Sequence, residues 1–241
     1  MNNFLTNNDD FFVVDNKVYK SEKDIIKLIR SAINNEKIVI IKSFVSSGNT
    51  INLREKIYSW GSSIQNEPPQ TFQNNTNYKV LENGISPYQK TLHYYQAYNF
   101  HDAPNLSFYN QLSEVFDPLI NFFNNYRQSS LSLKDVNNNK SLRPQLLHFF
   151  KGGGFLASHI HQKEPQNIGL ILMASQRFID FKKCTIAFEK DDHIIDPGDL
   201  LEVGDLLVFN YGQRHWVTSC DIEEKMSYDN SGFWIFTLPY Y

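Results

Sequence analysis

The sequence of 241 residues has only two cysteines, Cys184 and Cys220, and no apolar run long enough to cross a membrane. Two cysteines cannot form the disulfide framework of a small secreted domain, and these two lack the spacing of a metal-binding pair, so we expect reduced thiols. The N-terminus also lacks the basic and apolar stretches of a signal peptide. These absences predict no membrane partner and favour a cytoplasmic location.

Neither sign of charge dominates, because 23 Lys and Arg residues stand against 26 Asp and Glu residues. The basic residues are scattered, so nothing predicts a nucleic-acid partner. Hydrophobic residues make up 41% of the chain and aromatic residues 15%, which is enough for a sizeable core. We therefore expect one globular domain over residues 1–241. No pattern in the sequence indicates its oligomeric state.

The first half of the chain predicts helices around one buried strand. Apolar residues recur at helical spacing between Ile25 and Ile33, between Leu53 and Trp60, and between Leu106 and Phe123. The segment KIVIIKSF, residues 37–44, carries four consecutive β-branched residues and predicts a buried strand.

A polar stretch from Gly61 to about Ser86 contains two adjacent prolines and predicts a long loop. Loops of this length are often lids over a site, although a plain surface loop has the same composition. Residues from about 20 to 140 are thus expected to form a helical support and lid region.

The second half, from about residue 141 to 241, changes to short apolar segments separated by turn residues. Such regular spacing predicts a sandwich, barrel or jelly roll. The expected strands cover about 144–150, 155–161, 168–174, 184–189, 193–196, 205–210, 214–219 and 232–238. The fold class is therefore mainly β with N-terminal α/β elements.

Three histidines have the spacing of a metal site. His159 and His161 stand one residue apart in a predicted strand, so their side chains point to the same face. His215 follows the strong strand segment GDLLVFN and can supply a third ligand. Three ligands on one side of an iron ion leave positions open for oxygen and substrate. The alternative is that these histidines are hydrogen-bonded structural residues or are simply exposed.

Four segments together carry a family resemblance: HFFKGGGFLASHIH, GLILMAS, DPGDLLEVGDLLVFNYGQRHWV and SGFWIFTLP. They resemble, in order and spacing, the iron(II) and 2-oxoglutarate-dependent oxygenases, whose core is a double-stranded β-helix flanked by helices. The helix, strand and helix expected near the N-terminus also look like those of this family. The resemblance implies a jelly-roll core, an iron(II) cofactor, 2-oxoglutarate as co-substrate, and molecular oxygen and a small organic molecule as substrates.

The resemblance places His159 and His215 on the two histidines of the family. His161 stands where the family has an aspartate or glutamate, which removes a negative charge from the metal site. Glu164 is three residues further on and could act as an outer acceptor or a replacement ligand, or be an exposed loop acid.

The family also anchors the distal carboxylate of 2-oxoglutarate with an Arg or Lys on the last strand, where this chain has Phe233. An arginine suits that role because it makes two parallel charge-assisted hydrogen bonds. Lys225 with Ser227 matches an alternative spacing of the motif, and Arg143 and Arg214 are substitutes that could reach the same pocket.

The spacing of the glycines and histidines resembles the cupin motifs equally well, and some cupins hold iron with three histidines and need no 2-oxoglutarate. Three functions therefore stay open: a 2-oxoglutarate-dependent iron oxygenase, which we favour; a three-histidine iron dioxygenase; and a non-catalytic barrel that binds a ligand. In the first two, Gln145 and Trp234 are expected to flank the metal site. The substrate itself is not encoded in any motif.

Overall fold

The first half of the chain contains both helices and strands, whereas strands dominate after residue 141. The computed structural model describes residues 4–21, 23–63, 77–85, 90–100, 103–134, 141–227 and 229–240. The strands are β1 (Phe4–Asn7), β2 (Phe11–Asp15), β3 (Ile38–Lys42), β4 (Asn77–Ile85), β5 (Lys90–Asn99), β6 (Gln145–Phe149), β7 (Gly154–His159), β8 (Ile168–Met173), β9 (Ile186–Lys190), β10 (His193–Ile195), β11 (Leu206–Asn210), β12 (His215–Cys220) and β13 (Phe233–Thr237). The helices are α1 (Asn16–Ser21), α2 (Ile25–Asn34), α3 (Ser47–Ser63) and α4 (Tyr109–Arg127), with 3₁₀ turns η1 (Ala103–Asn105) and η2 (Gly198–Leu200).

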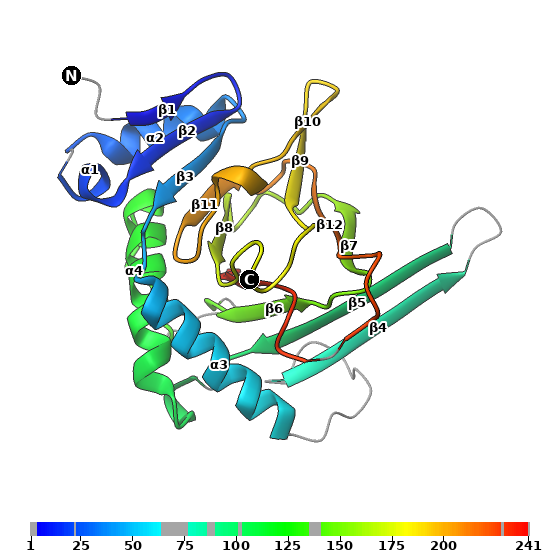
Figure 1. The fold of residues 1–241 in the computed structure, drawn as a ribbon. Coiled ribbons are helices and arrows are strands. Elements are labelled where there is room, and N and C mark those ends of the chain that lie inside the picture. The colour runs from blue at the N-terminus through cyan, green and yellow to red at the C-terminus, as the bar shows by residue number, and fades with distance from the viewer. Residues whose placement is uncertain are drawn as a thin grey trace.

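Two facing sheets form the β core (Figure 1). Within the described residues the larger sheet has nine strands, in the order β1-β2-β3-β11-β8-β13-β6-β5-β4. The smaller sheet has four strands, in the order β10-β9-β12-β7. After β5 the chain passes repeatedly from one sheet to the other: β6, β8, β11 and β13 lie in the larger sheet, and β7, the hairpin β9–β10 and β12 lie in the smaller one. This is the jelly-roll arrangement expected from the sequence. The predicted fold class is confirmed.

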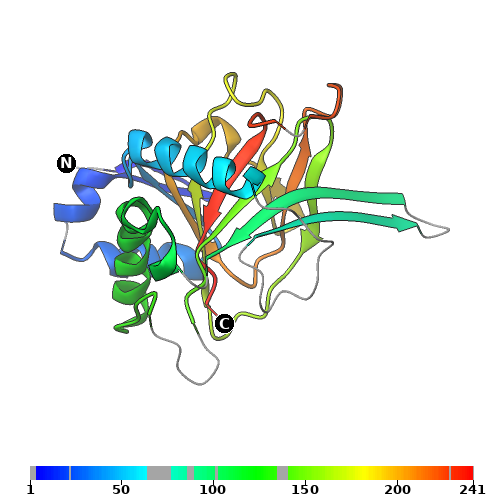
Figure 2. The ribbon, with the colours of Figure 1, turned by 90° about the horizontal axis from the view of Figure 1, so that it is seen from below.

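The larger sheet separates two hydrophobic cores because its side chains alternate between its faces. Phe233 and Ile235 of β13 point toward the smaller sheet and belong to the core inside the jelly roll. Trp234 and Phe236 of the same strand point the other way, into a core shared with α2, α3 and α4. Figure 2 shows α3 and α4 on that outer side of the sheet.

All eight strands expected after residue 141 are present, with ends that differ by at most two residues from the prediction. The helices expected near residues 25–33, 53–60 and 106–123 and the strand within 37–44 are present as well. Strands β1, β2 and β5 were not predicted, and they extend the larger sheet at its two ends.

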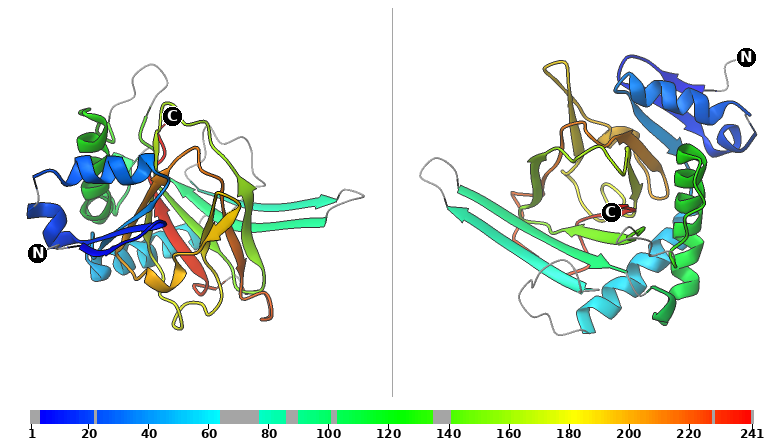
Figure 3. Two further views of the ribbon diagram at one scale, coloured as in Figure 1. Left: turned by 90° about the horizontal axis from the view of Figure 1, so that it is seen from above. Right: turned by 180° about the vertical axis from the view of Figure 1, so that it is seen from behind.

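The loop expected between Gly61 and Ser86 is wrong in part. Helix α3 continues to Ser63, and β4 covers Asn77–Ile85, while residues 64–76 and 86 lie outside the described residues. Strand β4 pairs with β5 over its whole length as the edge of the larger sheet. Backbone hydrogen bonds to β5, rather than an apolar pattern, define this strand, which is why its polar sequence predicted a loop. The hairpin β4–β5 projects beyond the barrel (Figure 3).

A buried histidine lies at the centre of the outer core. His148 of β6 is fully buried and stacks on Trp234, with ring centroids 3.6 Å apart and planes 5° from parallel. Its Nε2 donates a hydrogen bond to the carbonyl oxygen of Ser231, at 2.8 Å. Burial, with a smaller contribution from the Arg54 cation, lowers the pKa of His148 from 6.5 to about 3. The ring is therefore neutral in the folded protein at neutral and mildly acidic pH.

This burial predicts a specific loss of stability in acid. Below pH 6.5 the unfolded chain protonates His148 and the folded protein does not, so the free energy of unfolding falls by about 1.4 kcal/mol per pH unit until pH approaches 3. Replacing His148 with Gln removes the group that takes up this proton. The decrease in the free energy of unfolding between pH 6.5 and 5 should therefore be smaller by about 2 kcal/mol. Urea unfolding followed by tryptophan fluorescence at several pH values measures the free energy of unfolding. Equal slopes for His148→Gln and the unmodified protein would contradict the assignment.

Candidate metal centre

Two strands of the smaller sheet bring His159 and His215 together. β12 pairs antiparallel with β7, and His215 lies directly opposite His159 in that register. The Nδ1 of His159 is 2.7 Å from the carbonyl oxygen of Ala157, and the Nδ1 of His215 is 2.9 Å from that of Gln213. A carbonyl oxygen can only accept, so each Nδ1 carries the proton and each Nε2 keeps a lone pair for a metal.

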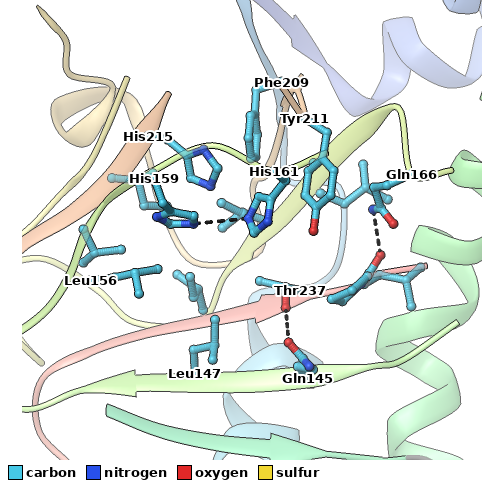
Figure 4. A pocket seen from close by; sticks show the side chains of 18 of the residues that line it. Gln145, Leu147, Leu156, His159, His161, Gln166, Phe209, Tyr211, His215 and Thr237 are labelled. Carbon is cyan, nitrogen blue, oxygen red and sulfur yellow. Dashed lines mark hydrogen bonds between the residues drawn. The ribbon is translucent and has the colours of Figure 1, made fainter. Parts of the chain in front are cut away.

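His161 lies two residues past the end of β7, and an aromatic contact orients it. Its imidazole stacks on the ring of Tyr211, with centroids 4.2 Å apart and planes 9° from parallel. Its Nε2 is 3.2 Å from the Nε2 of His159. Figure 4 shows the three imidazoles pointing toward one another at one end of the cavity.

The three histidines fit a divalent metal. One nitrogen from each lies within 4.8 Å of the other two. Two imidazoles bound at a right angle, each about 2.1 Å from an ion, have nitrogens about 3.0 Å apart, close to the separation in the His159–His161 pair. Burial is the main cause that lowers the pKa of His161 to about 4 and that of His215 to about 3. These two rings are therefore neutral at neutral pH, the state that binds metal.

The histidines open onto a cavity of about 530 Å³ between the two sheets. Apolar side chains form most of its wall. The described residues that line it include no aspartate, glutamate or lysine, and Arg143 is the one arginine among them. They are Asn99, Arg143, Gln145, Leu147, Phe149, Leu156, His159, His161, Gln166, Gly169, Leu170, Ile171, Ile186, Phe209, Tyr211, His215, Val217, Ile235, Thr237, Leu238 and Pro239.

The polar side chains of the cavity are largely bonded to one another. The amide of Gln145 donates to Asn99, and its carbonyl oxygen accepts from the Thr237 hydroxyl at 3.4 Å. The amide of Gln166 donates to the backbone oxygens of Ile168 and Leu238. This polar wall is held in place before any ligand binds.

One glycine makes room for a ring beside the metal ligands. Gly169 of β8 pairs with Phe209 of β11, and a Cβ on Gly169 would lie 2.1 Å from the Phe209 ring. That ring packs edge-on against His215, with centroids 4.7 Å apart. A side chain at position 169 would therefore push Phe209 toward the metal ligand.

Several residues expected at the site lie elsewhere. Lys225 and Ser227 are in the turn between β12 and β13, where Ser227 bonds to the backbone of Lys151 beside the start of β7. His159 is at the other end of β7, so the turn that carries Lys225 is a strand length from the metal ligands. Lys225 is exposed and is not among the residues that line the cavity.

Three further expectations also fall outside the cavity. Arg214 is exposed and pairs with Glu189 at 3.3 Å. Glu164 is exposed and accepts a hydrogen bond from Asn167 at 3.4 Å. Trp234 faces the helices, because the residues of β13 that point into the barrel are its odd-numbered ones. Gln145 and Arg143, by contrast, do line the cavity.

Tyr211 and Thr237 line the cavity but were not predicted from the sequence as site residues. Tyr211 directly follows the strand that precedes His215, which was a usable signal. Thr237 shares its face of β13 with Ile235, so the two-residue period of the strand would have found it once the inward face was known.

Comparisons with known proteins find the same fold at low sequence identity. No family model and no curated protein matches the sequence. A prolyl-4-hydroxylase from Pseudomonas putida aligns over 89% of this chain and 96% of its own, with a TM-score of 0.56 and 13% identity. A prolyl hydroxylase from Trichoplax adhaerens, in complex with a hypoxia inducible factor peptide fragment, covers 93% and 92%, with a TM-score of 0.59 and 10% identity. An oxidoreductase of the 2OG-Fe(II) oxygenase family from Burkholderia pseudomallei covers 90% and 88%, with a TM-score of 0.51 and 10% identity.

The fold is thus the one that the sequence resemblance implied. In addition, none of the described helices is both long and apolar enough to cross a membrane.

The stacking of Tyr211 on His161 predicts that Tyr211 positions this imidazole for metal binding. Tyr211→Leu removes the flat surface and should weaken iron(II) affinity by about tenfold, a typical cost of losing a residue that orients a ligand. Tyr211→Phe keeps the ring and should bind iron like the unmodified protein. Anaerobic competition with a chromophoric chelator measures both affinities. Equal affinity in the Leu variant would show that the stack does not orient His161.

Proposed function

We propose that this protein is a non-haem iron(II) oxygenase in which His159, His161 and His215 hold the metal and a 2-oxo acid is the co-substrate. The observation that carries the proposal is the convergence of three imidazoles, from two strands and a following loop, on one end of a mainly apolar cavity. The solved structures with this fold have names that specify hydroxylases and an oxygenase, which supports the same reading.

The charge of the cavity supports an anionic co-substrate. Imidazole ligands bring no negative charge, so they leave the two positive charges of a bound iron(II) uncompensated, and no described residue of the cavity is a carboxylate. An ion with that charge in an apolar surrounding favours an anion as its next ligand. A 2-oxo acid brings a carboxylate and a keto oxygen to adjacent positions. The same features leave open a direct chelating substrate, as in the three-histidine dioxygenases.

The chain supplies binding, orientation and exclusion of water. The stacked ring of Tyr211 and the two Nδ1 hydrogen bonds fix the imidazoles, and the polar wall around Gln145 and Thr237 can orient a substrate. Bound iron(II) would supply the activation of oxygen: one oxygen atom would go to a small organic substrate and the other to the 2-oxo acid, which would be converted to carbon dioxide and a carboxylic acid one carbon shorter.

2-Oxoglutarate is the co-substrate that the family name of the Burkholderia structure specifies. Its second carboxylate needs a cation, and Arg143 is the candidate among the described residues that line the cavity. Lys225, Ser227 and Arg214 are not in the cavity and are not part of this proposal.

The metal ligands are tested by substitution. His159→Ala and His215→Ala should each abolish stoichiometric iron(II) binding, measured anaerobically by equilibrium dialysis. His161→Asp should retain it, because a carboxylate is a good iron ligand and restores the two-histidine, one-carboxylate set. His193→Ala is the control, since that exposed residue is on the edge strand β10. Stoichiometric iron in His215→Ala would overturn the metal site.

Catalysis is tested by oxygen consumption. We expect uptake by the iron-loaded protein to require both iron(II) and a 2-oxo acid, and to fall to background in His215→Ala. Uptake that requires iron(II) and a substrate but no 2-oxo acid would favour a three-histidine dioxygenase. Bound iron without any uptake across a broad substrate screen would favour a binding protein.

A further inference from the structure

The interior of the cavity suits a hydrocarbon group better than a second carboxylate. Residues that face the barrel on β6 are Gln145, Leu147 and Phe149, in order from the outer end inward. Thr237 and Ile235 of β13 lie opposite Gln145 and Leu147. Along the larger sheet, the cavity wall thus changes from a polar pair, Gln145 and Thr237, to an apolar pair, Leu147 and Ile235.

The smaller sheet changes in the same way, starting from the metal ligands. His215 lies opposite His159 on one side and Phe188 on the other. One step further in, Val217 lies opposite Leu156 and Ile186. Figure 4 shows both Leu156 and Leu147 below the histidines. Among the side chains that the structure describes, the layer immediately inside the metal ligands is therefore apolar on both sheets.

No described residue of this inner layer carries a charge or a hydrogen-bond donor on its side chain. Its members that line the cavity are Leu147, Phe149, Leu156, Ile171, Ile186, Val217 and Ile235. Phe233, one step deeper on β13, packs against Phe149 and Phe181 and adds no polar group. Arg143 precedes β6 and bonds through its backbone to Pro239, at the outer end of the cavity. Arg143 therefore lies at the outer, polar end of the cavity, whereas the inner layer lies at its apolar end.

We propose that the co-substrate is a 2-oxo acid with an apolar side chain. Its apolar side chain lies in this inner layer, and its carboxylate and keto oxygen chelate the metal. The inference rests on the proposed function and specifies the co-substrate of that same site. A carboxylate placed among these side chains loses its hydration and gains no partner, whereas an alkyl group of the same shape gains from burial. An acid with an apolar side chain therefore binds more tightly than 2-oxoglutarate.

A matched pair of ligands tests the inference on the unmodified protein. 5-Methyl-2-oxohexanoate differs from 2-oxoglutarate only in having an isopropyl group in place of the terminal carboxylate. Iron(II) stoichiometry is measured first, without oxygen, and each acid is then titrated while the visible charge-transfer band of the chelate is recorded. We expect 5-methyl-2-oxohexanoate to bind at least about a hundredfold more tightly than 2-oxoglutarate. Affinity should also rise about fourfold with each methylene from 2-oxobutanoate to 2-oxohexanoate.

Two variants test whether the inner layer causes the preference between the two acids. Ile235→Arg introduces a cation there and should reverse the preference toward 2-oxoglutarate. Lys225→Ala, at an exposed position outside the cavity, should leave the ratio of the two affinities unchanged. The ligand series on the unmodified protein decides the matter if Ile235→Arg does not fold.

The outcomes separate this inference from the proposed function. If iron(II) does not bind, the proposed function fails. If iron(II) binds and 2-oxoglutarate binds more tightly than its isopropyl counterpart, the inference is wrong and the proposed function stands, with Arg143 as the anchor to test. Bound iron(II) with no band from any of these acids overturns both the inference and the 2-oxo acid of the proposed function, and favours direct chelation by the substrate.

Discussion

The antiparallel register of β7 and β12 is the constraint on which the site depends. It sets His215 opposite His159, and a shift by one residue would turn one of the two imidazoles to the outer face of the sheet. The register also places Val217 opposite Leu156, so it fixes the apolar layer behind the metal ligands together with the ligands themselves. Metal binding and the character of the cavity therefore follow from a single strand pairing.

The strands of the jelly roll and the three histidines can be predicted from the sequence because both depend on local patterns. Alternation along a strand and the His-x-His spacing are visible within a few residues. The position of Trp234 cannot be predicted in this way, because the inward face of β13 depends on β6 and β8, which flank it in the sheet. The spacing between His215 and Lys225 is equally uninformative, because the turn between β12 and β13 folds back on the beginning of β7.

The edge strands were missed for a different reason. β4 and β5 exist because their backbones pair with each other and β5 pairs with β6, and no apolar period in the sequence marks such pairing. His161 shows the same limit on a smaller scale. It lies beyond the end of β7, so the rule that residues two apart share a face of a strand does not apply to it. The contact with Tyr211, from a different strand, brings it to the other imidazoles.

The larger sheet runs without interruption from the N-terminal strands into the jelly roll, since β3 pairs with β11 and β11 with β8. A fragment that begins near residue 141 would contain both histidine strands and every strand of the smaller sheet. It would also leave β11 as an open edge and expose the outer faces of Trp234 and Phe236, which α3 and α4 now cover. Such a fragment would present unpaired backbone and apolar surface to other molecules, so it should aggregate rather than fold alone. We therefore propose that the chain is a single unit for genetic dissection, although its helices and its metal ligands lie in different halves.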